Sequence, residues 1–107
     1  MGSKELRNME KEIEGIKKEL MGIGEIRPGS LSQQYRKPTE KVGPYYQLSY
    51  MHKMKSRTDY IRPQFVEQTR NQIDAYKRFK KLTQHWVELG IAHAKLTVEI
   101  AKKKIRK

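Results

Sequence analysis

The sequence contains no cysteine among its 107 residues. This absence excludes disulfides, thiolate metal sites and cysteine nucleophiles. No apolar run approaches the roughly 18 residues that a membrane-spanning helix needs, and the N-terminal residues lack the apolar core of a signal peptide. We therefore expect a cytoplasmic protein with no membrane partner.

Arrangements of residues that support catalysis or metal binding are also scarce. The three histidines, His52, His85 and His93, form no H-x-H or H-E-x-x-H pattern of metal ligands. The chain has no glycine-rich phosphate loop and no paired carboxylates suited to acid–base chemistry. We expect no catalytic residues, no metal site and no cofactor, and we predict that the protein is not an enzyme.

Acidic residues are few: 12 against 24 lysines and arginines, which gives a net charge of +12. Residues 1–26 hold five basic and six acidic side chains (net −1), residues 27–63 eight and two (+6), and residues 64–107 eleven and four (+7). A surplus of this size favours a polyanionic partner, most often nucleic acid. A nucleoid association would follow if that partner is DNA.

All four prolines lie between residues 28 and 63, which leaves both flanking segments free to be helical. In residues 1–24 the apolar positions recur at spacings of three and four, which predicts an amphipathic helix with a coiled-coil-like interface. We expect Gly22 and Gly24 to end this helix in the left-handed conformation. The predicted interface residues are Leu6, Met9, Ile13, Ile16 and Leu20.

Residues 64–107 predict a second, longer helix that begins just after Pro63, a residue suited to the first helical position. A helix of this length cannot bury its own apolar side, so it needs the N-terminal helix, a second subunit, or both. We expect an oligomer, with a dimer favoured. The predicted interface residues of this helix are Phe79, Leu82, Trp86, Leu89, Leu96 and Ile100.

Residues 25–63 contain three segments in which side chains alternate between apolar and polar, "SLSQQYR", "YYQLSYM" and "KSRTDYIR". Short connections rich in turn residues separate them, which predicts a three-stranded antiparallel sheet. The predicted fold class is therefore α+β, with an N-terminal helix, a small sheet and a long C-terminal helix that packs on both.

The period of two along a strand divides the side chains between two faces. We expect the long helix to cover a face that contains Leu31, Tyr35, Tyr46, Leu48, Tyr50 and Tyr60. This division assumes a three-residue loop, His52 to Met54, before the last strand. A loop of two or four residues would move Lys55 and Arg57 to the covered face, which would be costly if they were buried without partners.

The opposite face is predicted to be polar and basic, and we interpret it as a surface for duplex DNA. A small antiparallel sheet can enter the major groove, where arginine reads guanine and glutamine reads adenine. The predicted contact residues are Gln34, Arg36, Lys37, Gln47, Ser49, Lys53, Lys55, Arg57 and Arg62.

Two other interpretations remain open. The protein could bind RNA, with Tyr45 as an exposed stacking platform. It could instead be a coiled-coil interaction or scaffold protein that binds a partner through the apolar side of its long helix, from Phe79 to Ile100.

The strings "RPGSLSQQY", "GPYYQLSY" and "RTDYI", between about residues 26 and 79, resemble a small uncharacterised prokaryotic family found around mobile elements. That family often carries a cysteine-rich knuckle between its first two strands, where this chain has "RKPTEKV", so any metal site that the resemblance implies is lost. The order of three strands and a helix, with the "GPYYQLSY" strand, also resembles the arm-type DNA-binding domains of tyrosine integrases.

Overall fold

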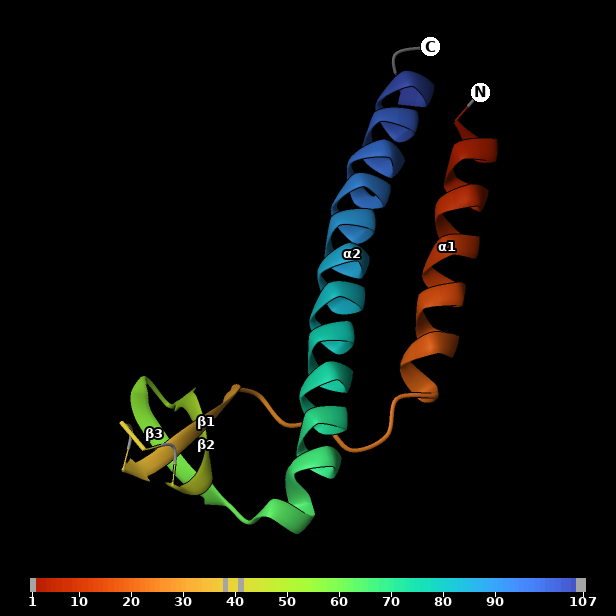
Figure 1. Ribbon diagram of the computed structural model, residues 1–107. Helices are drawn as coiled ribbons and strands as arrows, with labels where there is room; N and C mark the ends of the chain where they lie inside the picture. The colour runs from red at the N-terminus through yellow and green to blue at the C-terminus, as the bar shows by residue number, and fades with distance from the viewer. Residues whose placement is uncertain (1, 38, 41, 106–107) are drawn as a thin grey trace. The chain divides into compact units, whose positions relative to one another are not determined.

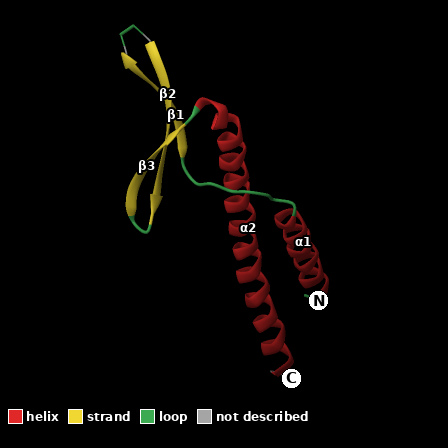
Figure 2. Cartoon of the chain, turned by 90° about the horizontal axis from the view of Figure 1, so that it is seen from below, coloured by secondary structure: helices red, strands yellow, loops and turns green. Residues whose placement is uncertain are grey.

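The computed structural model describes residues 2–37, 39, 40 and 42–105, the side chain of Val42 excepted. It contains two helices and a sheet of three strands (Figures 1 and 2). In chain order the elements are α1 (Ser3–Met21), β1 (Ser30–Lys37), β2 (Val42–His52), β3 (Lys55–Ile61), the 3-10 turn η1 (Pro63–Phe65) and α2 (Val66–Ile105). The predicted α+β class and order of elements are confirmed.

α1 ends, and α2 begins, close to the predicted residues. Pro63 occupies the first turn of η1, which leads directly into α2, as expected of a residue that lacks an N–H group. The predicted end of α1 is wrong in one respect, because Gly22 has φ −83° and is not left-handed. The last turn instead tightens, since the N–H groups of Gly22 and Ile23 bond to carbonyl groups three residues earlier.

The sheet has the strand order β1-β2-β3, and both pairs of neighbours are antiparallel. β2 extends further toward its N-terminus than predicted, because Val42, Gly43 and Pro44 belong to the strand. Pro44 pairs with Tyr35 on β1, beyond the end of β3, so its missing N–H group removes no bond to β3.

The chain consists of two compact units, and α2 contributes to both of them. One unit, Gly24–Arg78, contains the sheet and the first part of α2. Its core is built from Leu48, which is completely buried, together with Ile61, Val66 and Ile73. Leu31, Tyr46 and Tyr50 pack around this cluster.

The segment before β1 is held against the first part of α2. The backbone N–H of Arg27 donates to the carbonyl oxygen of Gln72 at 3.1 Å, and the Gln72 side-chain amide donates to Glu25 at 2.9 Å. Gly29 has φ +134°, and a Cβ atom there would lie 2.8 Å from a Leu48 methyl carbon and from the Ser49 carbonyl oxygen. Only glycine allows the chain to enter β1 this close to the core.

The other unit pairs α1 with the part of α2 that begins at Phe79 (Figure 1). The Nζ atom of Lys17 lies 5.5 Å from the centroid of the Trp86 ring, within cation–π range. The Nε2 atom of His85 lies 3.8 Å from Oε2 of Glu12, and that of His93 lies 3.8 Å from Oε2 of Glu10. In these contacts, residues further along α2 meet residues earlier in α1, so the two helices are antiparallel.

Each residue predicted to form the helix interface is buried or half-buried in this unit. Ile16 is the most buried of them, with 6% of its surface exposed. The others are Leu6, Met9, Ile13 and Leu20 on α1 and Phe79, Leu82, Trp86, Leu89, Leu96 and Ile100 on α2.

Candidate nucleic-acid interface

The register of the sheet decides which side chains share a face. Residues directly opposite each other on neighbouring strands project to the same side, and successive residues project to opposite sides. We call the side of Leu48 the inner face, because Leu48 lies in the core. The outer face is then formed by Ser30, Ser32, Gln34, Arg36, Tyr45, Gln47, Ser49, Met51, Ser56, Thr58 and Tyr60.

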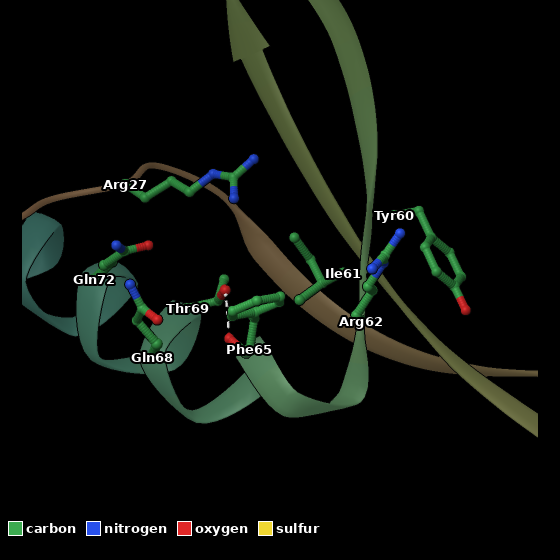
Figure 3. A pocket seen from close by; sticks show the side chains of 8 residues that line it. All are labelled: Arg27, Tyr60, Ile61, Arg62, Phe65, Gln68, Thr69 and Gln72. Carbon is green, nitrogen blue, oxygen red and sulfur yellow. Dashed lines mark hydrogen bonds between the residues drawn. The ribbon is translucent and has the colours of Figure 1, made fainter.

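The predicted position of β3 was wrong by one residue. His52 pairs with Lys55, so the loop between β2 and β3 contains two residues and not three. Ile61 therefore joins the core, with 6% of its surface exposed, whereas Tyr60 moves to the outer face and is 57% exposed. Figure 3 shows Ile61 pointing toward Phe65 and Thr69, and Tyr60 pointing away from them.

Lys55 and Arg57 consequently lie on the inner face and do not join the predicted polar surface. The desolvation cost that argued against this register does not arise, because both side chains remain exposed. Asp59 is on the inner face too, opposite Leu48, and its carboxylate accepts a hydrogen bond of 2.6 Å from Arg27. The ion pair with Arg27 balances the negative charge of Asp59, the one carboxylate that β3 directs toward the core side.

The structure separates the nine residues predicted to bind nucleic acid into three groups. Gln34, Arg36, Gln47 and Ser49 lie on the outer face, and Arg62 follows immediately after β3, in phase with Tyr60. Lys53 lies in the loop between β2 and β3. The remaining three, on the inner side, are Lys37, Lys55 and Arg57.

Tyr45 and Tyr60 stack against each other on the outer face. Their ring centroids are 6.0 Å apart and the ring planes differ by 26°. The two residues come from neighbouring strands, and each faces a glutamine across the sheet, since Gln34 pairs with Tyr45 and Gln47 with Tyr60. The sequence predicts Tyr60 on the covered face, so it does not predict this pair.

Arginines are present near the aromatic pair. Arg36 crosses over Gly43, where a Cβ atom would lie 3.3 Å from carbon atoms of the arginine side chain and where φ is +70°. Arg62 is exposed at the end of β3, beyond Tyr60. No aspartate or glutamate occurs among the described outer-face residues. The described part of this face combines aromatic, amide, hydroxyl and guanidinium groups with the exposed thioether of Met51.

A hollow of about 380 Å³ adjoins this face at the edge formed by β3 (Figure 3). Phe65, which is 49% exposed, forms part of it, and the hydroxyl of Thr69 donates to the Phe65 carbonyl oxygen at 2.8 Å. The lining is mostly polar, and it consists of Arg27, Tyr60, Ile61, Arg62, Phe65, Gln68, Thr69 and Gln72. Tyr60 and Arg62 therefore border both the outer face and this hollow.

Within the described residues, no group of three or more histidine, aspartate or glutamate side chains could hold a metal ion. Neither helix, over the same part of the chain, has an apolar stretch long enough to cross a membrane. Separately, the register brings stacking, hydrogen-bonding and cationic groups together on the outer face.

The family described as "Domain of unknown function (DUF6788)" matches residues 6–71, which is more than half of the chain. The chain belongs to this family. The matched segment covers most of α1, the whole sheet and the beginning of α2, and therefore includes the outer face. DUF6788 has no assigned function, so membership names no activity. No curated protein and no solved structure matches the chain.

Proposed function

We propose that this protein is a non-enzymatic nucleic-acid-binding protein that holds a single strand across the outer face of its sheet. The observation that carries the proposal is the Tyr45–Tyr60 stack on a face whose described residues include no carboxylate. Aromatic rings at a sheet surface stack on unpaired bases, and arginines beside them neutralise the phosphates. The net charge of +12 favours such a partner over the whole chain.

Single strands fit these residues better than the duplex DNA that the sequence predicted. Groove binding required Lys55 and Arg57 beside Gln34 and Gln47, and the register places the two cations on the other side. In a duplex the base faces are already stacked on each other and are out of reach of a tyrosine ring. The proposal covers single-stranded DNA and RNA, because both display base faces and phosphates. The association with mobile elements, implied by the resemblance, remains a prediction.

Fluorescence anisotropy with short labelled oligonucleotides tests the stacking part of the proposal. The probes are a single-stranded DNA, an RNA of the same sequence, the corresponding duplex, and an abasic strand of equal length that retains only the phosphates. We expect the single strands to bind more tightly than the duplex or the abasic strand, because stacking contributes about 1–3 kcal/mol per base. Tyr60→Leu should remove most of that difference, while thermal unfolding checks that the sheet remains folded.

A pair of double variants tests which side of the sheet meets the phosphates. Arg36→Gln with Arg62→Gln should weaken binding and reduce the dependence of log affinity on log salt by about 0.7 for each lost contact to a single strand. Lys55→Gln with Arg57→Gln removes the same charge from the inner side and serves as the matched control. A larger effect of this control would move the site to the inner side. No binding of any probe at low salt would refute the proposed function.

For the alternative, an interaction protein that acts through its long helix, we propose a surface other than the predicted stripe. The residues between Phe79 and Ile100 that were expected to meet a partner lie instead in the unit formed with α1 and are half-buried there. One other side of α2 is apolar and exposed, and this observation keeps the alternative in consideration.

A further inference from the structure

A second apolar stripe runs along the C-terminal half of α2. Its positions are separated by 4, 3, 4, 3 and 4 residues, the spacing of a coiled-coil core. All six residues are exposed, and the four larger ones are 60%, 52%, 51% and 83% exposed in chain order. We call this stripe the distal seam; it consists of Val87, Ile91, Ala94, Val98, Ala101 and Ile105.

The distal seam is separate from the surface that α2 presents to α1. With about 100° of rotation per residue, its centre lies roughly 140° around the helix from the row that includes Trp86, Leu89 and Leu96. That row is half-buried, whereas the distal seam is exposed in the described part of the chain. Ala94 and Ala101 leave shallow positions between the larger side chains, so the stripe alternates in height along the helix.

This alternation is complementary to itself when a second copy of the helix runs in the opposite direction. An antiparallel pairing centred on residue 96 places Val87 opposite Ile105, Ile91 opposite Ala101, and Ala94 opposite Val98. Two of these three kinds of layer combine a β-branched side chain with an alanine, which fills the space between the helices evenly. A parallel pairing would instead set Ala94 against Ala94 and Ala101 against Ala101, leaving two thin layers.

The charges beside the distal seam favour the same direction. In the antiparallel pairing Glu88 of each helix flanks Lys102 of the other, and both side chains are exposed and available. Lys95 meets its own copy near the two-fold axis, which weakens the association but leaves two attractive pairs for one repulsive pair. In a parallel pairing the flanking positions would bring Lys95 beside Gly90 and Lys102 beside Thr97, so no opposite charges would meet.

We propose that the distal seam binds a second copy of this chain, so that two α2 helices pack antiparallel in a symmetric homodimer. The same surface is used on both subunits, as two-fold symmetry requires. The interface is short, about 27 Å along the helix for 19 residues, so the dimer population should depend on protein concentration. This inference does not rest on nucleic-acid binding.

Sedimentation velocity of the full chain without nucleic acid, over a range of concentrations, tests the association. We expect the mass to rise from monomer to dimer, and Ile91→Glu with Val98→Glu to raise the dissociation constant by at least about tenfold. The matched control is Met51→Glu with Met54→Glu, which adds the same charge at exposed apolar positions outside α2. Circular dichroism checks that all variants stay folded.

Engineered thiols test the direction, because the native chain has no cysteine and each introduced one is unique. Ile91→Cys alone and Ala101→Cys alone should not form disulfide-linked dimers, whereas their mixture should cross-link under mild oxidation. Glu88→Lys should weaken the dimer, and adding Lys102→Glu should restore it.

Three results would each overturn the proposal. They are a monomer at every concentration, a dimer that survives Ile91→Glu with Val98→Glu, or cross-linking of Ile91→Cys with itself, which would indicate parallel helices.

Discussion

Lys53 and Met54 form the two-residue loop between β2 and β3, and both have positive φ, +50° and +64°. Two consecutive residues of this kind are typical of a type I′ turn, whose twist matches that of the strands. Such turns normally contain asparagine and glycine, because other side chains are strained at positive φ. The loop therefore carries conformational strain that its own residues do not relieve.

Replacing the loop residues should stabilise the protein. We expect Lys53→Asn with Met54→Gly to raise the free energy of unfolding by about 1 kcal/mol, because the strain disappears while no packing is lost from Met54, which is 95% exposed. Urea denaturation measures the change. Lys53→Ala with Met54→Ala is the control, since alanine keeps the strain. Destabilisation by the asparagine–glycine pair would mean that the loop has another conformation.

At the scale of the element, the candidate site depends on the register of β3, which decides which of its side chains face the core. In the observed register Ile61 is in the core and Tyr60 is exposed. Ile61→Ala should therefore cost about 2–5 kcal/mol of unfolding free energy, whereas Tyr60→Ala should cost clearly less, since it removes mainly the stacking with Tyr45. Thermal or urea unfolding of both variants decides the matter. A larger loss of unfolding free energy for Tyr60→Ala than for Ile61→Ala would instead support the three-residue loop.

The sequence predicted the elements well and the arrangement of β3 less well. Helical spacing, proline placement and strand alternation are local signals, so the existence and order of the elements could be read directly. The register depended on a loop without asparagine or glycine, and on the assumption that Lys55 and Arg57 would be buried if they shared the inner face. Lys55 and Arg57 both stay exposed on the inner face, so the cost of burying them could not decide the register. The packing of Ile61 in the core could decide it.

The candidate site was only partly predictable for the same reason. Gln34, Arg36, Gln47 and Ser49 lie on β1 and β2, whose alternation was read correctly, and they share the predicted face. Tyr60 required the β3 register and was missed. The distal seam of α2 had a readable spacing, but Ala94 and Ala101 weaken its hydrophobic pattern beside the stronger one that contains Trp86 and Leu89.

At the scale of the whole molecule, α2 is the one element, among those that the structure describes, that belongs to both units. It is continuous from Val66 to Ile105, and Gly90 is its only glycine. Outside its two chain neighbours and the adjacent helix backbone, a Cβ atom at Gly90 would meet no atom within 4 Å. Replacing this glycine therefore changes the stability of the helix without disturbing its packing.

Gly90→Ala should raise the free energy of unfolding by about 0.5–1 kcal/mol, because alanine loses less conformational freedom in a helix. Since α2 is shared, we expect the unfolding midpoints of both units to rise together. Tryptophan fluorescence and a sheet probe, such as the hydrogen exchange of β2 amides, measure the two midpoints. A shift in the tryptophan signal alone would show that the units unfold independently.

The aromatic side chains are divided between the two units in a way that makes such measurements simple. The only tryptophan, Trp86, lies in the helical unit, and all six tyrosines lie between residues 24 and 78, in the unit that contains the sheet. The protein thus carries a separate intrinsic chromophore for each unit. A ligand that stacks on Tyr60 should alter tyrosine emission, whereas an event along the C-terminal half of α2 should alter tryptophan emission. Events in the two units can therefore be distinguished in one unlabelled sample.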